Sequence, residues 1–283
     1  MTQTKASSSS TVSRALPSDT TIAVAPDKQV DVRVYGRKTG DEVLPLVVHF
    51  HGGAFTSGDL DSGCTVANLL QEAGAWVISV AYPLAPKHPF PQPLEIGYGV
   101  LQWAFKNRTR LAGKGAPLYL AGEEAGGNLA AGVCMIARDQ FQPPVAGQIL
   151  VSPMLDPCAG TASLRALQGE KIECKFADGW QSYLSCGRDA EHPYAVPART
   201  QRLAGLPPSL ILMGEEDPMR DEALAYAARL ESGGLTVFQH VFNKVEQWPQ
   251  ALLEAPPPPC PCAAEVLEQF RKFFEVTRCQ LAR

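Results

Sequence analysis

Five short, continuous apolar runs divide the chain from about residue 45 onward. They are rich in β-branched residues and lie at 45–51, 75–82, 116–122, 146–152 and 208–214. Apolar runs of this length without polar alternation are typical of strands that are buried on both faces of a parallel sheet. The pattern therefore predicts a central sheet that is mostly parallel.

Helical periodicity fills the intervals between these runs. Apolar residues repeat on one face at 94–105, 219–233 and 266–274. Strands that alternate with helices through short connections predict a right-handed, doubly wound α/β sheet. The segment 20–37, which precedes the alternation, has the pattern of an antiparallel strand pair at the edge of that sheet.

The remaining segments set the expected domain organisation. Residues 1–20 are rich in serine and threonine and are predicted to form a flexible leader, with a single domain over 21–283. Residues 155–205 are too long for a plain loop, so we expect small cap elements over the strand ends within them. The proline-rich segment 255–262 cannot be helical and is predicted to be an extended connection.

Composition and charge narrow the classes of partner. The chain has 29 acidic and 25 basic residues, a net charge of −4 and no long run of like charge, which argues against a nucleic-acid partner. No apolar run approaches the roughly 18 residues of a membrane span, and the N-terminus lacks the apolar core of a signal peptide. We therefore expect a cytoplasmic protein whose eight cysteines are free thiols.

A glycine-rich segment follows the first of the apolar runs. Residues 49–55 read HFHGGAF. Two adjacent glycines allow the backbone N–H groups of Gly52 and Gly53, with Ala54 beside them, to point at one oxygen atom. Such a loop is half of an oxyanion hole, the group of donors that stabilises a negatively charged oxygen during acyl transfer.

A second segment, AGEEAGGN at 121–128, follows the third apolar run. It keeps the frame of the G-x-S-x-G turn, in which a nucleophile stands between a strand and a helix. Glu124 stands at the position of the serine. The backbone N–H of the next residue, Ala125, would complete the oxyanion hole.

The chain resembles the hormone-sensitive-lipase-like family of α/β-hydrolases from about residue 45 to 235. HGGAF resembles the family's HGGGF, YPLAPKHPFPQPLE at 82–95 resembles YRLAPEHPFPAALED, and GEEAGGN replaces GDSAGGN. Residues 203–230 resemble the stretch that carries the family's catalytic aspartate. Four motifs in the same order are more specific than any one of them. The resemblance implies the α/β-hydrolase fold, a mostly parallel, twisted central sheet flanked by helices, with a small cap.

The resemblance also assigns the remaining triad positions. Asp217 matches the triad acid in the family's D-P-L-R-D motif. The triad histidine should follow a strand in an H-G-F motif, but the chain reads LTVFQHVFNKVEQWP there. Depending on the alignment, Glu246 or Gln247 takes the place of the histidine. His240 falls within the predicted strand and is interpreted as a strand residue.

These replacements change the chemistry that the site can support. Serine hydrolysis needs a hydroxyl that attacks and an imidazole that carries the proton. A glutamate at a helix N-terminus beside oxyanion donors is expected to fill the hole with its own carboxylate. If Glu246 joins Glu124 and Asp217, three carboxylates would share a proton or bind a cation such as Mg²⁺ or Ca²⁺. No ligand spacing in the sequence demands a metal, and no cofactor is expected.

Three functions remain open at this point. The first is a non-hydrolytic homologue, a pseudoenzyme that binds a small apolar or carbonyl-bearing ligand or a protein partner. The second is a lyase, dehydratase or cyclase that uses Glu124 as acid or base, and the third is residual esterase activity. Members of this family often dimerise through sheet edges or terminal helices, so a homodimer is a further expectation from the resemblance.

Overall fold

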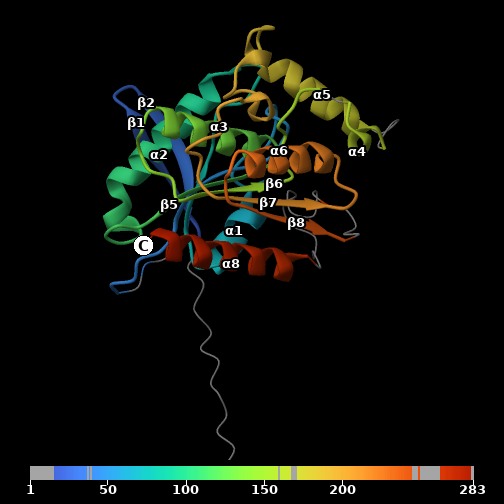
Figure 1. The fold of residues 1–283 in the computed structure, drawn as a ribbon. Helices are drawn as coiled ribbons and strands as arrows, with labels where there is room; N and C mark the ends of the chain where they lie inside the picture. The colour runs from blue at the N-terminus through green and yellow to red at the C-terminus, as the bar shows by residue number, and fades with distance from the viewer. Residues whose placement is uncertain are drawn as a thin grey trace, which may run out of the picture.

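An eight-stranded sheet forms the middle layer of the molecule (Figure 1). The computed structural model describes residues 16–36, 38, 40–158, 160–166, 171–243, 248 and 262–281, without the side chains of 171–174 and 281. The strands are β1 (Ser18–Ala25), β2 (Lys28–Tyr35), β3 (Leu46–Phe50), β4 (Trp76–Val80), β5 (Leu118–Glu123), β6 (Gly147–Val151), β7 (Ser209–Gly214) and β8 (Val237–Phe242).

The order of the strands is β1-β2-β4-β3-β5-β6-β7-β8. The pairs β1–β2 and β2–β4 are antiparallel, and all other neighbouring pairs in this sheet are parallel. The five apolar runs form β3 to β7, and the segment 20–37 contributes the antiparallel edge pair. The predicted fold class and strand pattern are therefore confirmed.

Helices cover both faces of the sheet. They are α1 (Cys64–Glu72), α2 (Gln92–Leu111), α3 (Ala125–Asp139), α4 (Ala162–Arg165), α5 (Lys171–Tyr183), α6 (Arg220–Ser232) and α8 (Ala263–Leu281), with the 3-10 helices η1 (Asp189–Glu191) and η2 (Pro197–Arg199). One core includes residues of α2, α3 and α6, and a second includes residues of α1 and α8. Val48 of β3 lies in the first core and Val47 in the second, as the alternation of side chains along a strand requires.

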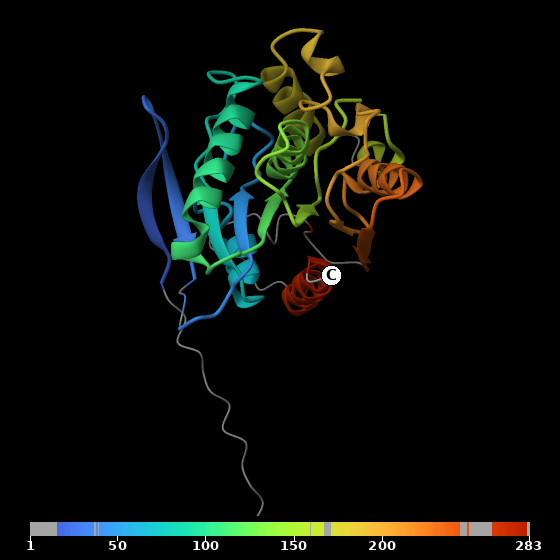
Figure 2. The ribbon, with the colours of Figure 1, turned by 60° about the vertical axis from the view of Figure 1, so that its left-hand side comes forward.

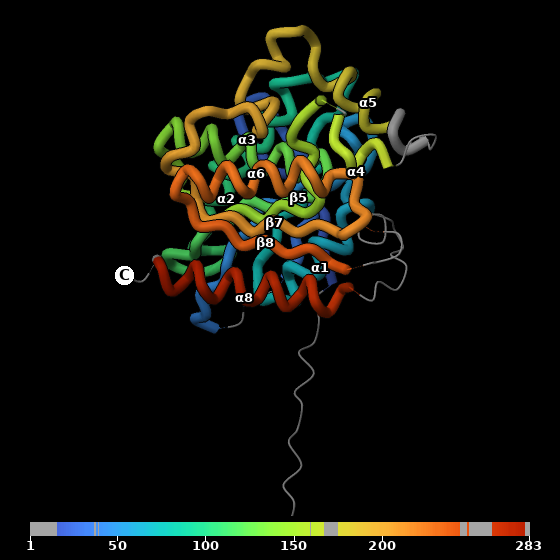
Figure 3. Tube along the Cα trace, turned by 45° about the vertical axis from the view of Figure 1, so that its right-hand side comes forward, coloured from blue at the N-terminus to red at the C-terminus, as the bar shows by residue number. Residues whose placement is uncertain are grey.

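The figures show the same layers. In Figure 3, α6 and α8 run on opposite sides of β7 and β8. Figure 2 shows the segment between β6 and β7, which includes α4 and α5, beyond the tips of the central strands. Because β3 and β5 are parallel neighbours, with Phe50 beside Gly122, the loops that follow them meet at this end of the sheet.

Several details differ from the sequence prediction. The strand β1 begins at Ser18, within the stretch assigned to the leader. The predicted helices are present as α2, α6 and α8, whereas α1 was not specified by the pattern. The segment 255–261 lies outside the described residues.

The expectation of free thiols holds only in part. Five cysteines in the described ranges are free: Cys64, Cys134, Cys158, Cys186 and Cys279. Cys262 is disulfide-bonded, so the prediction was wrong for this residue. Sequence spacing alone does not establish which thiols meet in the fold, since a disulfide depends on the distance between the two Cα atoms.

Candidate functional site

Glu124 lies in a tight turn between β5 and α3. Its backbone has φ 50° and ψ −118°, a sparsely populated conformation for a residue with a side chain. A Cβ atom on Gly122 would lie 2.2 Å from the carbonyl oxygen of Gly126, and one on Gly126 would lie 2.0 Å from that of Phe50. The close approach of backbones therefore requires both glycines, as in a strand–turn–helix nucleophile elbow.

The Glu124 side chain points toward the loop that follows β3. Its Oε2 accepts the backbone N–H of Gly53 at 2.8 Å, and its Oε1 lies 3.4 Å from Nζ of Lys175 on α5. The Glu124 side chain is 1% exposed, whereas that of Lys175 is 46% exposed. One N–H group of the HGGAF loop is thus bound to a carboxylate of the chain itself.

Helix α5 packs against the same loop. A Cβ atom on Gly179 would lie only 2.3 Å from the carbonyl oxygen of Ala54. The rings of Phe55 and Tyr183 stack with centroids 4.0 Å apart, and Trp180 packs on Phe55 at 5.0 Å. The aromatic side chains of α5 therefore pack directly on the residues that follow the two glycines.

Asp217 lies in the loop after β7 and is fully buried. Its Oδ1 accepts the backbone N–H of Met219 at 2.8 Å. Its Oδ2 accepts the hydroxyl of Ser152 and, at 2.8 Å, the indole N–H of Trp248. Burial raises the pKa of Asp217, and the hydrogen bonds from Ser152, Met219 and Trp248 oppose that rise.

The indole of Trp248 resembles a triad histidine in one respect only. It donates an N–H to the carboxylate, as the Nδ1–H of a histidine does in a catalytic triad. An indole has no second, basic ring nitrogen, so it cannot take a proton from a nucleophile. Trp248 is 6% exposed, and its Nε1 also lies 2.8 Å from the hydroxyl oxygen of Ser152.

Two buried histidines lie beside the turn. Nε2 of His49 is 2.7 Å from Oε2 of Glu123, and its Nδ1 is 3.0 Å from the hydroxyl of Ser79. Burial raises the pKa of Glu123, and the interaction with His49 opposes that rise. Burial also lowers the pKa of His51 to about 4, and its Nδ1–H donates to the carbonyl of Gly52 at 2.7 Å. His51 is therefore neutral at pH 7.

The predicted site residues occupy two groups. Glu124 and Gly53 are in direct contact, Gly52 and Ala54 flank Gly53 in the same loop, and Ala125 is the first residue of α3. Asp217 belongs to the second group, with Ser152 and Trp248. Glu246 and Gln247 lie outside the described residues, so their positions stay predictions.

Two other expectations concern histidine and metal. His240 lies in β8, where its Nε2 is 2.8 Å from Oε1 of Glu265 on α8, in agreement with its interpretation as a strand residue. Within the described part of the chain, no group of three or more His, Cys, Asp or Glu side chains is placed to hold a metal ion.

The sequence did not reveal two residues of this site. Trp248 is the final residue of the E-Q-W stretch, in which Glu246 and Gln247 are the predicted replacements of the histidine. Its signal is an aromatic ring with an N–H donor, six residues after the end of β8 at Phe242. Lys175 carried no sequence signal, because its distance to Glu124 depends on how α5 packs over the turn.

The strand order, the elbow after β5 and the buried acid after β7 are features of the α/β-hydrolases. The chain belongs to this family: a model of the alpha/beta hydrolase fold matches residues 47–246. The resemblance that the motifs indicated is thereby confirmed at the level of the family.

Particular relatives include esterases and a receptor. The chain is 34% identical over 215 residues to the carboxylesterase NlhH of Mycobacterium tuberculosis, covering 74% of this chain and 67% of that protein. It is 34% identical over 208 residues to the gibberellin receptor GID1B of Arabidopsis thaliana, covering 69% of this chain and 58% of the receptor. The structure of the carboxylesterase EstE1, cloned from a metagenomic library, matches with a TM-score of 0.83 and 27% identity over 93% of this chain and 90% of that one.

The length and composition of the helices bear on whether the chain could cross a membrane. Across the ranges that the structure describes, no helix combines the length and the apolar composition that crossing a bilayer requires.

Proposed function

We propose that this chain is a non-hydrolytic α/β-hydrolase homologue, a pseudoenzyme with a carboxylate at the elbow in place of a nucleophilic serine. The observation that carries this proposal is the 2.8 Å hydrogen bond from the N–H of Gly53 to Oε2 of Glu124. In an active esterase, a donor of this loop would face the developing oxyanion of the substrate. Here a substrate oxygen would have to displace a resident carboxylate.

The chemistry of Asp217 supports the same proposal. Ester hydrolysis through an acyl-enzyme needs a base that takes a proton from the nucleophile and returns it to the leaving group. The indole of Trp248 binds Asp217 at 2.8 Å but has no basic nitrogen. Loss of a triad serine or histidine lowers kcat by about 10⁶ in a serine protease. We therefore expect no ester turnover by this route.

A binding function is the corollary of this proposal. A small apolar or carbonyl-bearing ligand could reach the Gly53 N–H only if Glu124 moved away and the contact with Lys175 broke. The segment with α4 and α5 would act as the cap over such a ligand. Formation of a homodimer and a cytoplasmic location remain predictions from the sequence.

A hydrolysis assay tests the proposal. The purified chain and its Glu124→Ala variant are incubated with p-nitrophenyl acetate and p-nitrophenyl butyrate, and release of p-nitrophenolate is followed. We expect both proteins to stay at the rate of a matched quantity of an unrelated protein. Turnover by the wild type that collapses in Glu124→Ala would overturn the proposal, because it would show that the carboxylate takes part in hydrolysis.

A second function, acid–base catalysis without a covalent intermediate, is supported by Lys175. Its half-exposed ammonium lies 3.4 Å from the buried Glu124 carboxylate and connects that group with solvent. Glu124 could then move a proton while an N–H of the loop stabilises an enolate-like oxygen, as a lyase or dehydratase requires. If Glu124 has this role, the wild type dehydrates β-hydroxycarbonyl compounds and the Glu124→Gln variant does not. The reaction is measured by the absorbance of the unsaturated product. Activity that persists in that variant rejects this role.

A further inference from the structure

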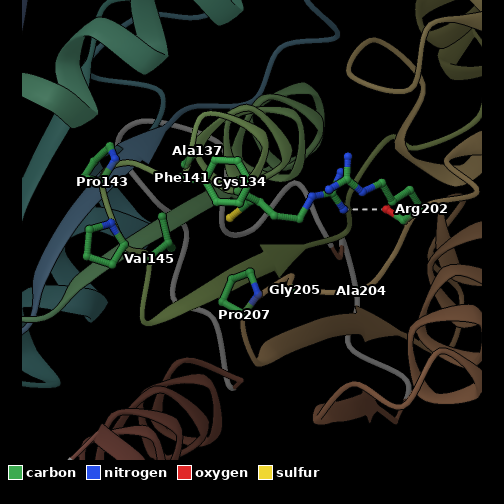
Figure 4. A pocket seen from close by; sticks show the side chains of 11 residues that line it. Cys134, Ala137, Phe141, Pro143, Val145, Arg202, Ala204, Gly205 and Pro207 are labelled. Carbon is green, nitrogen blue, oxygen red and sulfur yellow. Dashed lines mark hydrogen bonds between the residues drawn. The ribbon is translucent and has the colours of Figure 1, made fainter.

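A hollow of about 510 Å³ lies at the far end of α3 from Glu124 (Figure 4). Helix α3 begins next to Glu124 and continues for 15 residues, which corresponds to roughly 22 Å. The walls of the hollow come from the last turns of α3 and from the segments that lead into β6 and β7. We call this hollow the α3-end pocket. It is separate from the candidate site at the elbow.

The lining of the α3-end pocket combines apolar surface with positive charge. Of its eleven lining residues, two are arginines, Arg138 and Arg202, and none is acidic. Prolines, Val145 and Phe141 supply most of the rest, and Figure 4 shows the sulfur of Cys134 among them. A pocket of this size falls within the range that small organic ligands occupy in proteins, about 300–1,000 Å³.

The two guanidinium groups share one carboxylate. Nε and Nη2 of Arg138 donate to Asp139 at 2.8 and 3.1 Å, and Nη1 of Arg202 lies 3.6 Å from the same carboxylate. The hydrogen bond from Arg138 holds the pKa of Asp139 below its usual range, and the hydroxyl of Tyr194 also donates to it. Two positive charges therefore face one negative charge, which leaves an excess of one positive charge at the pocket.

Arg138 and Arg202 differ in how exposed their side chains are and in how many contacts they already make. The Arg138 side chain is 9% exposed, and its Nη1 donates to the backbone carbonyl of Arg202. The Arg202 side chain is 70% exposed, and its contact with Asp139 is long, at 3.6 Å. A planar guanidinium in this position can bind a carboxylate through two parallel hydrogen bonds.

Phe141 marks the apolar side of the pocket. Its side chain is 83% exposed, an unusual degree for a phenylalanine, and its backbone has φ 57°. An exposed aromatic ring beside an apolar hollow gives a ligand's hydrocarbon part a surface to cover. We propose that the α3-end pocket binds an apolar monocarboxylate, whose charged end meets Arg202 and whose hydrocarbon part lies against Phe141 and the neighbouring prolines.

Titration calorimetry with sodium octanoate tests this site. We expect saturable binding to the wild type, and binding at least ten-fold weaker for octanamide, which has the same chain without the charge. Arg202→Gln should weaken octanoate binding by a similar factor, because it removes the charge of an exposed side chain. Ala204→Trp should abolish binding, because it fills the pocket and keeps both arginines.

The matched control is Arg108→Gln. Arg108 lines a neighbouring hollow of about 360 Å³ that shares Pro144 and Val145 with the α3-end pocket. Octanoate affinity should not change in this variant. The proposal is overturned if octanoate does not bind the wild type, if octanamide binds equally well, or if Arg108→Gln weakens binding while Arg202→Gln and Ala204→Trp do not.

Discussion

Glu124 and Trp248 each present a hydrogen-bonding group where serine-hydrolase chemistry needs a different one. A serine at the elbow would leave the N–H of Gly53 free for a substrate oxygen, whereas the longer Glu124 side chain reaches that N–H itself. A histidine beside Asp217 would offer a basic nitrogen, whereas the indole offers only a donor. Both side chains form hydrogen bonds with polar groups of the site, Glu124 with the N–H of Gly53 and Trp248 with the carboxylate of Asp217.

The donor of Trp248 should contribute measurably to stability. Trp248→Phe keeps an aromatic ring and removes the N–H that binds Asp217 and Ser152 at 2.8 Å. Loss of a hydrogen bond to a buried carboxylate lowers the free energy of unfolding by about 1–3 kcal/mol. Urea unfolding of this variant is compared with that of Trp103→Phe, the same change at a half-buried tryptophan of α2. Equal stability of the two variants would contradict the role of the indole N–H.

The contact between α5 and the HGGAF loop depends on the absence of a side chain at Gly179. Alanine normally favours a helix over glycine by about 1 kcal/mol. Here its Cβ would lie 2.3 Å from the carbonyl oxygen of Ala54, which belongs to backbone and cannot turn aside. The packing of α5 over the loop is therefore specified by a glycine within a helix, against the local helix propensity.

This packing gives a prediction about α5. Gly179→Ala should lower the free energy of unfolding in urea by about 1–3 kcal/mol, because the helix must move off the loop. The control is Gly187→Ala, where an added Cβ has no heavy atom within 4 Å and the change should stay within about 0.5 kcal/mol. If Gly179→Ala is at least as stable as the wild type, α5 does not pack on the loop in this way.

The elements of the sheet were predictable, and the contacts between distant segments were not. Continuous apolar runs identify β3 to β7, because a strand buried on both faces has no polar face to show in its pattern. The elbow was recognisable because its turn requires Gly122 and Gly126: an added Cβ atom at either position would lie only 2.0–2.2 Å from a backbone oxygen. Lys175 lies 51 residues from Glu124 in the sequence and Trp248 lies 31 residues from Asp217, and only the packed structure brings each pair together.

Buried carboxylates should make the stability of the whole molecule depend on pH. Burial raises the pKa of Glu123, Asp217 and Glu222, in the last case from 4.5 to about 8. A folded state that raises the pKa of an acid favours its protonated form. The stability from Glu222 is therefore fully present below about pH 4.5 and is lost as the pH rises through about 8.

Glu222→Gln tests this dependence. Glutamine keeps an oxygen that accepts the backbone N–H of Leu155, which Glu222 binds at 2.9 Å, and removes the ionisation. We expect the free energy of unfolding to fall between pH 5 and 8.5 in the wild type, and to fall less in the variant. Glu231→Gln, an exposed position on the same helix, is the control. If the free energy of unfolding falls equally steeply with pH in Glu222→Gln and in the wild type, the pKa of Glu222 is not raised in the folded state.

In the proposed function, the replacement of two reacting groups separates this chain from its esterase relatives. The most direct measurement is the kcat/KM for p-nitrophenyl butyrate of a Glu124→Ser and Trp248→His double variant, with Glu246→His and Gln247→His as alternative second changes. We expect that Glu124→Ser alone stays near background and that one of the double variants exceeds it at least about 10²-fold. Double variants that unfold like the wild type yet stay at background would show that these two replacements do not explain the difference from the esterases.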